Sequence, residues 1–120
     1  MIIIDEAKVK PITAGDGSSL KELLSPKNKL GSNYSLAHAV VRPGNATKLH
    51  RLKSSEVYYI IHGEGEMYID DEIREVKEGN AIYIPPNSRQ KIMNTGSEDL
   101  VLLCIVDPAW EAEQEEILEK

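Results

Sequence analysis

The chain has 120 residues, a formal net charge of -6 at pH 7 and one cysteine. This length fits one domain, the lone cysteine excludes an intrachain disulfide and favours a reducing, cytoplasmic setting, and the acidic balance argues against nucleic acid as a partner. No apolar run is long enough to span a membrane, and the first residues lack the pattern of a signal peptide, so neither membrane insertion nor export is expected.

Residues 1–33 are predicted to form a mixed segment ahead of the main body of the fold. The β-branched run at 2–4 indicates an edge strand, and the alternation over 8–13 indicates a half-buried strand. Residues 19–22 have the spacing of a capping box, which predicts one short helical turn ended by Pro26, with a plain loop as the alternative.

From residue 34 onward the sequence predicts a series of short strands. Segments rich in Val, Ile, Tyr and Leu alternate with turns of Gly, Pro, Asn and Asp, a pattern typical of an all-β sandwich or barrel. The last of these segments is apolar on both faces, which predicts a central strand covered on both sides. The predicted strands span 34–41, 56–61, 66–69, 73–76, 81–84, 89–93 and 100–106.

The segment 107–120 is predicted to be a short C-terminal helix. Asp107 is a suitable cap, with Pro108 at the first helical position. Trp110 and Ile117 then share one apolar stripe with Leu118, which would pack on the barrel or on a second subunit. The many glutamates of this segment are expected on a solvated helix face.

The strongest candidates for chemistry are His50, Glu56 and Gln90. Strand alternation places Glu56 on the same face as Tyr58 and Ile60, so Glu56 faces the interior if Ile60 does. An ionised carboxylate in that position needs a partner or a cation, and His50 is the nearest candidate. Gln90 lies on a later strand, where its amide oxygen would be a third ligand or a hydrogen-bond acceptor.

Over roughly residues 34–106 the chain resembles the cupin superfamily, through two motifs whose spacings fit without a gap. The matching residues are Gly44, His50, Glu56 and Gly63 in the first motif and Gly79, Pro85 and Asn94 in the second. The resemblance implies a double-stranded β-helix, which is a jelly-roll-like barrel, and a single cupin domain over residues 1–120.

The departures from the family pattern bear on the metal. Cupins typically hold Mn, Fe, Ni, Zn or Cu with three histidines and the glutamate, but here Leu52 and Gln90 replace two of the histidines. Asn87 replaces a motif glycine, and Asn also tolerates positive φ. In one interpretation His50, Glu56 and Gln90 hold one divalent metal, with donors that suit Fe, Mn or Zn. In the other, the metal is lost, the three form a hydrogen-bonded cluster, and Leu52 fills the vacated space.

A substrate pocket is predicted around Leu52, Tyr58 and Cys104. The tyrosine would bind a substrate or only pack, and the cysteine either faces the pocket or, as we favour, is a small core residue. His38 is expected to be a hydrogen-bonded residue of the barrel wall, and His62, beside a glycine turn, is expected to be exposed.

Two classes of function are compatible with these residues. The first is a metal-dependent enzyme acting on a small polar metabolite, of dioxygenase, isomerase or lyase type. The second is a non-catalytic, small-molecule (sugar-like) binding module that has lost the metal. Because cupins commonly dimerise, the resemblance also implies a homodimer, in which residues 2–4 would extend a neighbouring sheet.

Overall fold

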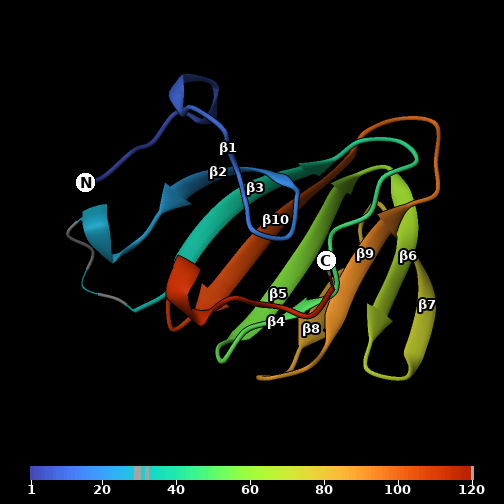
Figure 1. The fold of residues 1–120 in the computed structure, drawn as a ribbon. Helices are drawn as coiled ribbons and strands as arrows, with labels where there is room; N and C mark the ends of the chain where they lie inside the picture. Colours follow the sequence, from blue (N-terminus) through green and yellow to red (C-terminus); the bar gives the residue numbers. More distant parts are fainter. Residues whose placement is uncertain (29–30, 32, 120) are drawn as a thin grey trace.

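The computed structural model describes residues 1–28, 31 and 33–119, which form two antiparallel sheets facing each other (Figure 1). The first sheet contains, in spatial order, β1 (Ile12–Thr13), β2 (Ser19–Leu24), β3 (Ser35–Val41), β10 (Leu100–Asp107), β5 (Ser55–His62) and β8 (Ala81–Ile84). The second contains β11 (Glu116–Ile117), β4 (His50–Arg51), β9 (Gln90–Asn94), β6 (Glu64–Ile69) and β7 (Glu72–Lys77). The all-β, double-stranded β-helix is confirmed. None of the described helices is long and apolar enough to cross a membrane.

Within the part of the chain that the structure describes, the helical content is confined to three single 3-10 turns, namely η1 (Glu6–Lys8), η2 (Pro26–Asn28) and η3 (Ala112–Gln114). All seven predicted strands are present, with ends within two residues of the predicted bounds. The short strand β4 was not predicted, because two residues are too few for a period to show. It is nevertheless the strand that carries His50.

The core lies between the two sheets and follows the predicted alternation. Glu56, Tyr58 and Ile60 of β5 all point inward and are only 6%, 4% and 0% exposed. Apolar side chains from β3, β6, β9 and β10 fill most of the interior. The buried polar side chains His50 and Gln90 come from the opposite sheet, so the interior has one polar region within an apolar core.

The predicted helical turn at 19–22 is wrong, because these residues belong to β2. Ser19 pairs with Val40 of β3, and Glu22 pairs with Ala37. A ladder along β3 satisfies more backbone groups than one isolated turn, whose nucleation is costly. The predicted strand at 2–4 is also wrong, since that run has no regular structure, and the predicted strand at 8–13 is reduced to the two residues of β1.

The predicted C-terminal helix is wrong as well. Asp107 is the last residue of β10, and the chain then runs in extended form apart from the single turn η3. It ends on β11, where Glu116 pairs with Arg51 and Ile117 pairs with His50. A helix of this length is marginal by itself, and here pairing with β4 replaces it.

The strand β10 is central, between β3 and β5, but its outer face is only partly covered, with Val101 and Leu103 half-buried. Ile105 is 43% exposed, and its neighbours Tyr59, Ile61 and Tyr83 on the same sheet are also exposed. An antiparallel sheet in contact with water normally alternates apolar inside and polar outside. The prediction that this strand is covered on both sides is therefore wrong for the isolated chain, which leaves an apolar sheet face open.

Candidate metal centre and pocket

A cavity lies between the sheets, bordered by the polar end of the core. About 40 Å³ of it is open to the centres of water molecules, which is room for a few waters. Its walls are apolar on the side of β3 and β10, and polar where Asp16, His50, Glu56 and Glu115 line it. The polar groups thus converge on a small, largely apolar chamber, as they do in ligand pockets.

His50 is held in a single tautomer. Its side chain is 2% exposed, and Nδ1 lies 2.6 Å from the carbonyl oxygen of Lys48. A carbonyl can only accept, so Nδ1 carries the proton and donates it. Nε2 then presents its lone pair to the cavity, 3.7 Å from Oδ2 of Asp16. A ring nitrogen fixed by a carbonyl on the other side is the usual support of a metal-binding histidine.

Asp16 comes from the turn between β1 and β2. Its Oδ1 accepts hydrogen bonds from the backbone N–H of Ser18 at 2.9 Å and from the Ser18 hydroxyl at 2.7 Å. Gly17 has φ +92°, which lets the chain turn back directly after the carboxylate. One oxygen of Asp16 is therefore fixed by the turn, and Oδ2 remains directed at His50.

Glu115 comes from the C-terminal segment, just after η3. Its Oε2 accepts a hydrogen bond from the indole Nε1–H of Trp110 at 3.2 Å. Its other oxygen lies against Gly15, where a Cβ would overlap it. Burial, together with the nearby Asp16 carboxylate, raises the pKa of Glu115 above its ordinary value.

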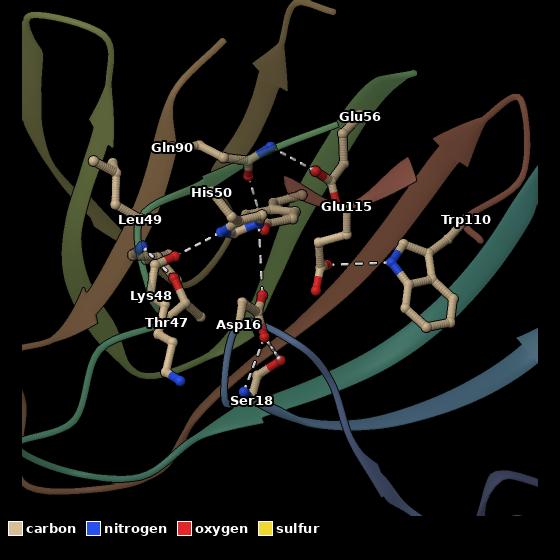
Figure 2. A network of polar contacts seen from close by, with 12 residues as sticks. Asp16, Ser18, Thr47, Lys48, Leu49, His50, Glu56, Gln90, Trp110 and Glu115 are labelled. Carbon is tan, nitrogen blue, oxygen red and sulfur yellow. Dashed lines mark hydrogen bonds and ion pairs between the residues drawn. The ribbon is translucent and has the colours of Figure 1, made fainter. Parts of the chain in front are cut away.

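Asp16, His50 and Glu115 form a candidate metal centre (Figure 2). One ligand atom from each lies within 4.8 Å of the other two. Two ligands of one ion are at most about 4 Å apart, since each bond is about 2 Å long. Shifts of under about 1 Å would close this triangle around an ion. One nitrogen and two carboxylate oxygens are a donor set that divalent transition metals accept.

Glu56, Gln90 and Tyr58 form a second cluster beside this centre. The amide Nε2 of Gln90 donates to Oε1 of Glu56 at 2.9 Å, and its Oε1 accepts from the Tyr58 hydroxyl at 3.1 Å. Burial raises the pKa of Glu56 to about 8. The hydrogen bond from Gln90 lowers this pKa, and the nearby Asp16 carboxylate raises it further. Glu56 therefore remains protonated at neutral pH in the metal-free protein.

The structure places the predicted site residues in one region but divides them. His50 belongs to the candidate metal centre, whereas both polar groups of the Gln90 amide are hydrogen-bonded to Glu56 and Tyr58. Leu52 is buried and lines the cavity. The hydrogen-bonded cluster therefore contains Glu56 and Gln90 with Tyr58, while His50 contacts Lys48 and Asp16 instead.

The remaining predicted residues have mixed outcomes. Cys104 both belongs to the core and lines the cavity, and burial raises the pKa of its thiol well above the ordinary value. His62 is exposed and pairs with Glu98 at 2.6 Å. His38 lies on the outer face of its sheet, with Nε2 3.3 Å from Glu6. Its Nδ1 has no hydrogen-bond partner among the described residues, so His38 is a wall residue with only one of its two ring nitrogens partnered.

Two residues of the candidate centre were missed by sequence reasoning. Asp16 is flanked by Gly15 and Gly17, and an acid between two glycines is a usable signal for a carboxylate presented by a tight turn. Glu115 has no comparable signal, because it lies within a run of acidic residues that was expected to be solvated. That expectation is wrong for Glu115, which is half-buried in the site.

The fold and the paired motifs define a small cupin-type barrel, and the comparison with known proteins agrees. The family model described as "Cupin domain" matches residues 37–106, which is more than half of the chain, so the chain belongs to the cupin family. An uncharacterized protein of Methanocaldococcus jannaschii is 46% identical over 113 residues, which cover 93% of this chain and 90% of that protein.

More distant relatives include proteins with functional names. An oxalate-binding protein of Thermotoga maritima is 26% identical over 105 residues, covering 86% of this chain and 87% of that protein. Among solved structures, a predicted oxalate decarboxylase of Thermotoga maritima superposes with a TM-score of 0.77 at 24% identity, covering 88% of this chain and 97% of the other. A polyketide cyclase of Streptomyces resistomycificus has a TM-score of 0.75 at 18% identity, covering 88% and 78%. At these identities the structures establish the fold.

Proposed function

We propose that the protein is a metal-dependent enzyme acting on a small polar molecule, with Fe, Mn or Zn held by His50, Asp16 and Glu115. The observation that carries this proposal is the tautomer of His50. Its Nδ1–H is donated to the carbonyl of Lys48, so its Nε2 faces the carboxylates of Asp16 and Glu115. A cation resolves that arrangement.

The residues around the centre suit chemistry on a bound small molecule. A divalent metal, when bound, supplies Lewis-acid polarisation of an oxygen ligand or a site for dioxygen. Glu56 lines the same cavity and carries a proton at neutral pH, so it is placed to donate that proton to a ligand. Gln90 holds Glu56 in position, which revises the proposed ligand set: Gln90 supports the site, and Asp16 and Glu115 take the ligand positions.

A second candidate is a non-catalytic module that binds a small molecule. It is favoured by Leu52, which fills part of the interior where the family has a histidine. The oxalate-related names of two relatives make oxalate a suitable probe for both candidates. The described residues that line the cavity include no lysine or arginine, so a dianion would depend on the metal for its binding.

Elemental analysis of protein purified without chelator tests the proposed metal. We expect close to one equivalent of Fe, Mn or Zn per chain, removed by EDTA and restored by adding the ion, because three ligands converge on one point. Oxalate turnover or binding is then measured on loaded and stripped protein. Protein that takes up no stoichiometric metal would contradict the enzyme proposal, and binding of oxalate by stripped protein would support the module.

We also propose that two copies pair through the open face of the first sheet. Ile105, Tyr59 and Tyr83 give this face an apolar surface over β10, β5 and β8, whereas the outer face of the second sheet carries charged residues such as Glu66 and Lys91. Since each copy has a net charge of -6, this apolar area is where two copies approach with the least repulsion. The expected mass by light scattering is twice 13.4 kDa. Replacing Ile105 by Asp is expected to give monomers, and a monomeric wild-type chain at micromolar concentration would contradict the pairing.

A further inference from the structure

The C-terminal segment 108–119 supplies a site residue although none of its own residues is buried, in contrast to the strand β10 that precedes it. It is held to the barrel by the two residue pairs between β11 and β4 and by hydrogen bonds near the surface. These bonds join Leu118 and Glu119 to Leu49, Ala109 to Asn33, Trp110 to Ser35, Pro108 and Gln114 to Ser54, and Glu116 to Arg51. Segments with few buried contacts are the ones that open at low cost.

This segment also covers the cavity. Trp110 and Glu115 both line it, and Figure 2 shows the indole N–H of Trp110 directed at the Glu115 carboxylate. With the segment in place, the space open to water centres is about 40 Å³, which accommodates a few water molecules.

Glu115 is held against the centre by two specific supports. Gly15 leaves the space that the carboxylate occupies, since a Cβ there would overlap it. Trp110 donates its indole N–H to the same carboxylate. Both therefore position Glu115, which is a candidate metal ligand supplied by the C-terminal segment.

The electrostatics of the centre make this position depend on a cation. Asp16 and Glu115 bring two carboxylates to within 4.8 Å of each other in a partly buried site. Ionised carboxylates so placed repel each other, and a divalent ion between them replaces the repulsion by two attractive contacts. Binding of the metal and closure of the segment are therefore coupled: part of the binding free energy of the ion stabilises the closed position of segment 108–119.

We propose that segment 108–119 is a gate latched by the metal: the ion holds it closed through Glu115, with Gly15 and Trp110 as positioning residues, and ligands enter while it is open. The gate rests on the proposed metal site, but it adds a claim that metal binding alone does not make. It predicts that the ion changes the mobility of one particular segment rather than that of the barrel strands.

Hydrogen exchange of the whole protein, followed by peptide mass spectrometry, tests the gate. In EDTA-stripped protein, amides within 108–119 are expected to exchange rapidly, and saturating Mn²⁺ is expected to slow them at least about tenfold. Peptides from β6 and β7 are the internal reference, because these strands lie away from the centre. Their exchange is expected to change little.

The matched variants are Gly15→Ala and Gly31→Ala. A Cβ at Gly31 meets no atom of the described residues within 4 Å, so this variant controls for the general effect of replacing glycine. Gly15→Ala is expected to weaken Mn²⁺ binding at least about tenfold and to abolish the slowing over 108–119. Trp110→Phe keeps an aromatic ring and removes the indole N–H, so it tests the same support of Glu115 without adding bulk. It is also expected to weaken Mn²⁺ binding and to reduce the slowing of exchange over 108–119.

The outcomes separate the gate from the proposed function. Stoichiometric Mn²⁺ with unchanged exchange over 108–119 would overturn the gate and leave the metal site standing. If the Gly15→Ala and Trp110→Phe proteins bind Mn²⁺ as tightly as the Gly31→Ala control, and show the same slowing of exchange, the positioning roles of Gly15 and Trp110 are overturned. Protein that binds no Mn²⁺ would remove the proposed function itself, and the gate with it.

Discussion

Replacing His50 by Ala is expected to weaken Mn²⁺ or Zn²⁺ binding at least about 100-fold. The imidazole is the only neutral ligand of the centre, and its Nε2 is already oriented by the hydrogen bond from Nδ1 to Lys48. Removing it leaves two carboxylates and a cavity, which hold a transition metal weakly and without a fixed geometry. Isothermal titration of EDTA-stripped protein with each ion measures the change.

The control for this prediction is His62→Ala. His62 is exposed and pairs with Glu98 on the surface, away from the cavity. It is expected to leave metal affinity within about a factor of two, as for a surface substitution away from the site. An ion that binds the His50→Ala protein as tightly as wild type would place the binding site elsewhere, provided that circular dichroism shows the variant to be folded.

Replacing Glu56 by Gln is expected to stabilise the metal-free protein by about 3 kcal/mol at pH 7. Burial raises the pKa of Glu56 from 4.5 to about 8. Below pH 4.5 the Glu56 carboxyl is protonated in both the folded and the unfolded chain, so it does not change the free energy of unfolding. As the pH rises toward 8, the unfolded chain releases a proton that the folded chain retains, so wild-type stability falls. Glutamine keeps the oxygen that accepts from Gln90 and has no proton to lose.

Urea denaturation of EDTA-stripped protein between pH 5 and pH 8 measures this effect. The advantage of Glu56→Gln is expected to grow steadily over that range. Glu75→Gln, at an exposed position on β7, is the control and is expected to change stability by less than about 0.5 kcal/mol. An advantage that stays flat with pH, or a variant less stable than wild type at pH 7, would show that Glu56 is ionised in the folded protein.

The fold was predictable because its information is local and periodic. The seven strands between residues 34 and 107 are rich in β-branched and apolar residues, and glycine, proline and asparagine turns separate them. Asn87, with φ 64°, occupies the kind of turn position that its place in the motif indicates. The inward face of Glu56 and Tyr58 also followed from alternation alone.

The chain termini were not predictable in the same way, because long-range pairing determines their structure. The capping-box pattern at 19–22 favours a helical turn, but the ladder with β3 makes it a strand. At the C-terminus the pairing of Ile117 with His50 replaces a helix that the stripe of apolar residues had indicated. In both cases local propensity was outweighed by a partner strand far away in sequence.

The site was half predictable for the same reason. His50, Glu56 and Gln90 lie within the motifs, and the structure brings them to one region of the interior. Asp16 and Glu115 come from opposite ends of the chain, 99 residues apart by their numbers, and only the closed barrel brings them together. Ligands that lie so far apart in the sequence form no short motif with a fixed spacing, so the sequence alone does not reveal them.

The most direct measurement is an anomalous difference map from crystals of the full chain grown with Mn²⁺. We expect one strong peak about 2 Å from Nε2 of His50 and from one carboxylate oxygen each of Asp16 and Glu115. Glu56 and Gln90 would remain hydrogen-bonded to each other beside it. A peak bound to Glu56 and Gln90 in place of the two acids, or no peak inside the barrel, would contradict this assignment of the metal centre.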